Sequence, residues 1–120
     1  MFDQKTILLI EDDEEMRSEL GGALSRAGYE VAGAGDGDNG LAFLRANRCD
    51  LVLLDLKLPG LNGREILNII GDEHPRIKVF IVTGSLFSEA GERALQRADA
   101  IINKPFRVAD LIGRIKAALG

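Results

Sequence analysis

The chain is poor in the residues that form disulfides and metal or thiol centres. It has one cysteine, Cys49, and one histidine among 120 residues. A single cysteine excludes an internal disulfide and fits a reducing compartment, so we expect a cytoplasmic protein. Cys49 stands beside Asp50 at a predicted strand entrance, and one histidine in the whole chain offers little to activate it. A reactive thiol is therefore disfavoured.

Long apolar runs and an excess of positive charge are also missing. No apolar run approaches the ~20 residues of a membrane span, and no signal peptide is visible. The formal net charge is −4. Because proteins that bind nucleic acid directly usually present a basic face, this charge argues against nucleic acid as a partner. We expect no membrane partner either.

What the chain does have is a buried strand that runs into a carboxylate. Four aliphatic residues, 51–54, lead directly to Asp55, and Pro59 and Gly60 mark the loop that follows. An unbroken aliphatic run of this kind is typical of a strand covered on both faces, as in a parallel sheet. Asp55 alone could be a loop acid or a helix N-cap. A functional role for Asp55 is indicated only if other polar residues lie beside it.

Further strands and helices alternate along the chain. Strands are predicted at 6–10, 29–34, 77–82 and 100–102, in addition to 51–54. The apolar periodicity predicts helices from Met16 to a stop at Gly28, over 40–47, after a cap at Asn62, over 89–96, and after Phe106. Residues 36–39 read as a turn, and the last helix is expected to bury Val108, Leu111, Ile112, Ile115 and Leu119. This alternation predicts a doubly wound α/β fold, a five-stranded parallel sheet with five helices, in a single domain over 1–120 without an output domain.

Polar residues follow four of the predicted strands. Asp12 and Asp13 follow the first, Asp55 the third, Thr83 the fourth and Lys104 the fifth. In a parallel sheet these strand ends share one edge, where ligands of open α/β sheets bind. Each residue has an ordinary alternative: an acid facing a helix dipole, a turn hydroxyl, or a solvated lysine.

Their coincidence points to phosphoryl chemistry. Three clustered acids would repel one another unless a cation holds them, and oxygen ligands with room for water suit Mg²⁺. An aspartate can then attack phosphorus and carry an aspartyl phosphate. In this hypothesis Asp55 is the nucleophile, while Lys104 and Thr83 each hold an oxygen of the phosphoryl group.

The chain resembles the receiver domain of two-component response regulators over its whole length. The resemblance is carried by Asp12-Asp13, by the run from Asp55 to Gly60 with Asn62-Gly63, by Thr83-Gly84, and by Lys104-Pro105-Phe106. It implies a flavodoxin-like (βα)5 fold and a regulatory protein, with a possible homodimer.

The same resemblance implies the roles of individual residues. Asp55 would take a phosphoryl group from the phosphohistidine of a sensor kinase or a histidine phosphotransfer domain. Asp13, Asp55 and the Lys57 carbonyl would contact Mg²⁺, and Asp12 would act through water. Thr83 and Gly84 would form the switch, with Lys104 binding phosphate. Pro105 would follow a cis peptide bond, which an X-Pro bond permits.

One position departs from the family pattern. The family usually carries Tyr or Phe three residues before the lysine, and Ile101 occupies that position here. A rotating aromatic ring is therefore missing, so we expect the output to rest on the loop from Thr83 to Phe87 and on the helix that follows it.

Two other functions remain open at this point. One is a phosphohydrolase resembling the haloacid dehalogenases, which use a second acid two residues after the nucleophile. Lys57 occupies that position here, so the general acid/base is missing. The other is an interaction module on the same fold that is not phosphorylated, although such a module has no need of a repulsive acid cluster.

Overall fold

The computed structural model describes residues 4–58, 62–84 and 96–120, and it contains one parallel sheet of five strands. The strands are β1 (Thr6–Ile10), β2 (Glu30–Ala34), β3 (Leu51–Asp55), β4 (Lys78–Thr83) and β5 (Ala100–Asn103). The helices in the described part of the chain are α1 (Glu14–Arg26), α2 (Gly37–Ala46), α3 (Gly63–Glu73) and α5 (Val108–Leu119).

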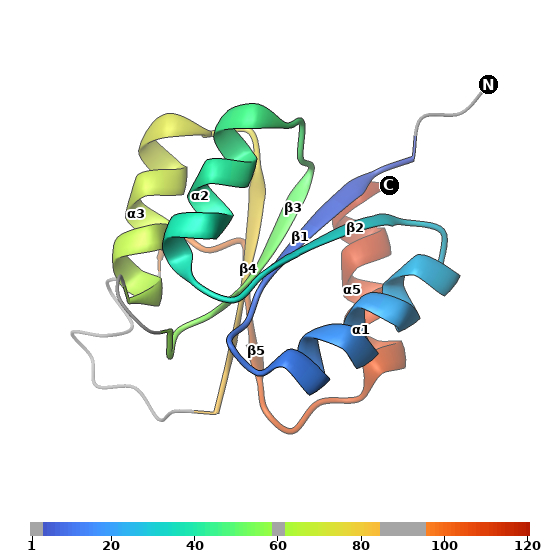
Figure 1. The fold of residues 1–120 in the computed structure, drawn as a ribbon. Coiled ribbons are helices and arrows are strands. Elements are labelled where there is room, and N and C mark those ends of the chain that lie inside the picture. The colour runs from blue at the N-terminus through green and yellow to red at the C-terminus, as the bar shows by residue number, and fades with distance from the viewer. Residues whose placement is uncertain (1–3, 59–61, 85–95) are drawn as a thin grey trace.

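The strand order is β2-β1-β3-β4-β5, and every neighbouring pair is parallel. The chain moves outward from β1 to β2 and then returns across β1 to build β3, β4 and β5 on the other side (Figure 1). The direction of winding reverses between β1 and β3, which are the neighbours that present Asp55 and the acids after β1. The predicted doubly wound parallel sheet is confirmed.

Helices cover both faces of the sheet, and the alternation of side chains explains why. Leu8, Val52 and Ile81 point toward α2 and α3, where they form one core with residues such as Leu41 and Ile66. The residues between them in each strand point toward α1 and α5. These two helices cover the other face of the sheet (Figure 1). Because both faces of the sheet are buried, the central strands are almost wholly aliphatic.

Two helices begin earlier than the periodicity predicted, because aspartates cap them. α1 begins at Glu14 rather than Met16, and Asp13 accepts a hydrogen bond from the Met16 amide at 3.1 Å. Residues 36–39 are not a turn. Asp36 accepts from the Asn39 amide at 2.8 Å, and α2 starts at Gly37. A capping side chain supplies a partner for an otherwise unpaired helix N–H group, which apolar periodicity does not record.

Other predicted boundaries are confirmed. Gly28 follows the C-cap of α1 with a φ of 103°, a conformation that a residue without Cβ adopts easily. Asn62 caps α3, accepting from the Glu65 amide at 3.1 Å. The helix predicted over 89–96 falls largely on residues 85–95, outside the described residues. Among the helices that are described, none is both long and apolar enough to cross a membrane.

The burial predicted for the last helix is wrong at Val108. Leu111 and Ile115 are fully covered, whereas Val108 is 40% exposed. Val108 is the first residue of α5, and it borders an open apolar hollow of about 440 Å³ beside α1 and Phe106. The first turn of the helix therefore stands clear of the neighbours that cover its later turns.

Candidate functional site

Asp55 ends β3 as a buried carboxylate with a hydrogen-bond donor on each oxygen. Its Oδ1 atom accepts from the Lys57 amide at 2.9 Å, and its Oδ2 atom accepts from Lys104 Nζ at 3.1 Å. Only 7% of the residue is exposed. A buried charge of this kind needs such partners, since an unpaired carboxylate in the protein interior is strongly destabilising.

Glu11, which the sequence reasoning passed over, lies beside Asp55. It is the first residue after β1, and carboxylate oxygens of Glu11, Asp12 and Asp55 all lie within 4.8 Å of one another. We call these three residues the acidic group. Lys104 Nζ lies 3.6 Å from Glu11 Oε2, so the same ammonium pairs with two members of the group.

The structure gives different roles to Asp12 and Asp13, which the sequence analysis grouped together. Asp12 belongs to the acidic group, but Asp13 caps α1 and is absent from it among the described residues. The sequence did carry a signal for this. Asp13 is followed by Glu14 and Glu15, an aspartate cap with acids in the first helical turn, which is a common helix start.

The other predicted residues lie at the same edge of the sheet. Thr83 is the last residue of β4, is 1% exposed, and pairs in register with Asn103. Its carbonyl accepts from the Lys104 amide at 2.8 Å. Gly84 follows directly and is exposed. The predicted cis bond between Lys104 and Pro105 is confirmed; it follows the residue whose ammonium reaches Asp55.

Gly63 allows α3 to begin against the backbone of the site. A Cβ atom added to Gly63 would lie 2.6 Å from Leu56 Cα and 2.8 Å from the Asp55 carbonyl oxygen. The Gly63 amide donates to the Leu56 carbonyl at 3.1 Å. A residue with a side chain would push α3 away from the end of β3, so glycine here lets the helix begin directly against the backbone of Asp55 and Leu56.

Ile101 lies on β5 opposite Ile81 and is half-buried against the core beneath α2 and α3. It is core filling on an edge strand, without a ring that could relocate. The loop from Thr83 to Phe87, where the sequence reasoning placed the response, falls partly outside the described residues.

The charges of the site perturb one another. Burial, followed by the hydrogen bond and repulsion from Asp55, raises the pKa of Glu11 to about 7. Burial acts to lower the pKa of Lys104, but Asp55 and Glu11 outweigh it, so the pKa of this lysine is raised. Among the residues that the structure describes, the three carboxylic acids of the acidic group therefore have a single ion-pair partner, the positive charge of Lys104.

The acidic group fits a small hard cation. Mg²⁺ prefers six oxygen ligands at about 2.0–2.1 Å, with several positions left to water. Three carboxylates whose oxygens already lie within 4.8 Å need only a modest contraction to share one such ion. The donor set contains no sulfur or imidazole, the ligands that structural zinc sites use, so it fits a hard cation better than zinc.

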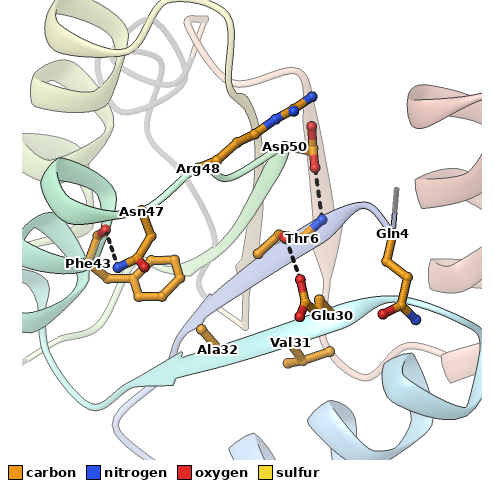
Figure 2. A pocket seen from close by; sticks show the side chains of 9 residues that line it. All are labelled: Gln4, Thr6, Glu30, Val31, Ala32, Phe43, Asn47, Arg48 and Asp50. Carbon is orange, nitrogen blue, oxygen red and sulfur yellow. Dashed lines mark hydrogen bonds between the residues drawn. The ribbon is translucent and has the colours of Figure 1, made fainter. Parts of the chain in front are cut away.

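A second hollow lies at the opposite edge of the sheet, near the start of the strands (Figure 2). It measures about 510 Å³ and borders β1, β2 and the end of α2. Two of its polar side chains make hydrogen bonds to the backbone: Asp50 accepts from the Thr6 amide at 2.8 Å, and Asn47 donates to the Phe43 carbonyl at 3.1 Å. The first contact joins the entrances of β1 and β3, and the second closes the last turn of α2.

Fold and site together define a class of protein: a doubly wound α/β domain with a buried aspartate, paired with a lysine, among acids at the carboxyl edge of its sheet. The family model of the response regulator receiver domain matches residues 7–116. The chain therefore belongs to the response regulator receiver domains, which serve two-component signalling systems.

Individual relatives agree with this assignment. The chain is 40% identical to the transcriptional regulatory protein CseB of Streptomyces coelicolor, over 99% of this chain and 51% of that protein. A CheY-like receiver domain from Methanospirillum hungatei is 34% identical, with a TM-score of 0.93 over 98% and 94% of the two chains. TrrA of Thermotoga maritima, solved with Mg²⁺ and BeF, is 27% identical, with a TM-score of 0.88 over 96% and 99%. The chain spans about half the length of CseB.

Proposed function

We propose that this domain accepts a phosphoryl group on Asp55 and switches a signalling surface in response. The observation that carries the proposal is the pairing of the buried Asp55 carboxylate with Lys104, beside two further acids. A structural salt bridge would need one acid for one lysine. The additional carboxylates are costly for folding, and they are useful only where a cation and a phosphoryl group are to be bound.

The acidic group would hold Mg²⁺, with the Lys57 carbonyl as a further oxygen ligand. This ligand set replaces Asp13 with Glu11, because Asp13 is engaged as the cap of α1. The ion supplies charge neutralisation on the oxygens of the phosphoryl group. That TrrA was solved with Mg²⁺ and BeF supports a magnesium site in this chain, since the two folds superimpose closely.

The transfer itself needs a nucleophile and fixed positive charge. A carboxylate oxygen of Asp55 attacks the phosphorus of a phosphohistidine, the P–N bond breaks, and the imidazole nitrogen leaves with the electron pair and takes up a proton. Lys104, released from its pairing with Asp55, holds one phosphoryl oxygen. Thr83, the last residue of the neighbouring strand β4, holds another.

The donor would be a sensor histidine kinase or a histidine phosphotransfer domain. Receiver domains take phosphoryl groups from histidine kinases, and this chain belongs to that family. The output would follow from the rest of a longer regulator: CseB is a transcriptional regulatory protein, and MtrA of Mycobacterium leprae, 32% identical, is a DNA-binding response regulator. DNA contacts would then belong to another domain, in keeping with the net charge of −4 here.

Incubation with acetyl phosphate and Mg²⁺ tests the proposal. Intact-mass analysis should show one added phosphoryl group that is stable in acid and labile in base. Asp55→Asn should abolish the addition, because an amide is not a nucleophile for phosphorus.

The matched control is Asp50→Asn at the opposite edge of the sheet. The amide oxygen can still accept from the Thr6 amide, so this variant should be phosphorylated as the wild type is. If Asp55→Asn is phosphorylated at the wild-type rate, the assignment of Asp55 is wrong.

A further inference from the structure

Arg17, in the second turn of α1, donates from Nη1 to the Glu11 carbonyl oxygen at 2.6 Å. The residue is half-buried. The ion pairs among residues 4–58, 62–84 and 96–120 do not include Arg17, although α1 carries several acids. The guanidinium is therefore directed to a main-chain oxygen, which a charged donor binds more strongly than a neutral one.

Two glycines leave room for this arrangement. A Cβ atom added to Gly33 would lie 3.0 Å from Arg17 Cδ, and one added to Gly35 would lie 3.4 Å from Arg17 Nη1. The arginine side chain thus lies flat along the end of β2 on its way to Glu11. A side chain at position 33 would crowd the aliphatic part of the arginine.

The consequence is that the Glu11 peptide is held from two sides. Its amide donates to the Ala34 carbonyl at 3.0 Å, and its carbonyl accepts from Arg17. The ladder between β1 and β2 ends at Ile10 and Ala34. These two bonds continue the hydrogen bonding of the sheet by one residue, to Glu11, the first member of the acidic group. They therefore also fix the peptide that leads into Asp12.

We propose that Arg17 is a positioning residue for the acidic group. The three carboxylates repel one another, so without an anchor the chain after β1 would swing Glu11 and Asp12 away from Asp55. Mg²⁺ demands near-ideal geometry, and a ligand held in place by its neighbours binds more tightly than one that must be gathered. This inference rests on the proposed magnesium site but concerns a residue that does not touch the ion.

Calorimetric titration of Mg²⁺ into Arg17→Met tests it. Methionine keeps the aliphatic packing on Gly33 and removes the donors, and Mg²⁺ should bind about tenfold more weakly. Amide exchange at Asp12 and Asp13 in metal-free protein should be faster than in the wild type. Arg26→Met, in the last turn of the same helix, is the matched control and should leave both measurements unchanged.

Gly33→Val tests the hydrogen bond from Arg17 to the Glu11 carbonyl separately from the charge of Arg17. It keeps the guanidinium charge and suits an edge strand, but its side chain occupies the path of Arg17. It should weaken Mg²⁺ binding in the same direction as Arg17→Met. If Gly33→Val binds like the wild type, or if Arg17→Met does, the positioning role is overturned. Failure of the wild type to bind Mg²⁺ would instead overturn the proposed function.

Discussion

The two edges of the sheet use aspartates in opposite ways. At the amino edge, Asp50 accepts from the Thr6 amide and so joins the entrances of β1 and β3 beside the larger hollow (Figure 2). At the carboxyl edge, Asp55 lies with two more acids and one lysine. The size of a cavity does not identify the site here. What distinguishes the carboxyl edge is its excess of like charge, which a bound cation would relieve.

The largest expected effect that sharpens this comparison concerns Mg²⁺ affinity. Asp12→Ala should weaken Mg²⁺ binding at least about tenfold, since Asp12 belongs to the acidic group. Asp13→Ala should leave that affinity nearly unchanged and instead lower the free energy of unfolding by about 1 kcal/mol, the usual effect of losing a helix cap. Calorimetric titration and denaturant unfolding measure the two quantities. If Asp12→Ala and Asp13→Ala lose equal Mg²⁺ affinity, Asp13 is a ligand and the distinction between the two residues is wrong.

The next effect is a pH dependence that belongs to the carboxyl edge. The pKa of Glu11 is raised to about 7, against 4.5 for an exposed glutamate. Between these values the folded state binds more protons at Glu11 than the unfolded state, so the free energy of unfolding should fall as pH rises from about 4.5 through 7.

Denaturant unfolding without Mg²⁺, across that pH range, measures this slope. Glu11→Gln cannot ionise and should flatten it. A saturating concentration of Mg²⁺ should restore stability at high pH in the wild type, since the ion binds the folded state. A wild-type slope identical to that of Glu11→Gln would refute the assignment.

A smaller effect is expected at the amino edge. Asp50→Ala removes the acceptor of the Thr6 amide and should lower the free energy of unfolding by about 1 kcal/mol. Mg²⁺ affinity and phosphorylation should not change. Asp50→Asn retains an acceptor and should be close to the wild type in stability. Any loss of Mg²⁺ binding in Asp50→Ala would show that the two edges are coupled, and the comparison would fail.

The smallest effect is expected at Ile101. An aliphatic β-branched side chain is stiff at χ1 and has no ring to relocate, so phosphorylation should change β5 less than the loop after Thr83. Amide exchange with and without a beryllofluoride mimic on Asp55 compares the two segments, and Ile101→Tyr is the matched variant. Large changes along β5 with none after Thr83 would contradict this prediction.

Local patterns in the chain were sufficient for most of the architecture. The aliphatic run before Asp55 predicts a strand buried on both faces. The alternation of strand and helix patterns along the chain predicts the parallel sheet. The cap at Asn62 and the stop at Gly28 were also visible. The periodicity wrongly predicts that Val108 is buried, because periodicity records the face of a helix but not where its neighbours end.

The sequence by itself determined that a carboxylate, a hydroxyl and a lysine follow successive buried strands, because strand ends are marked by local hydrophobicity and turn residues. The tertiary structure decided which acids after β1 join Asp55. Glu11, Asp12 and Asp13 are consecutive acids with similar intrinsic chemistry. Their roles diverge because α1 needs a cap at Asp13, while Arg17 and Ala34 hold the peptide of Glu11 where its side chain meets Lys104.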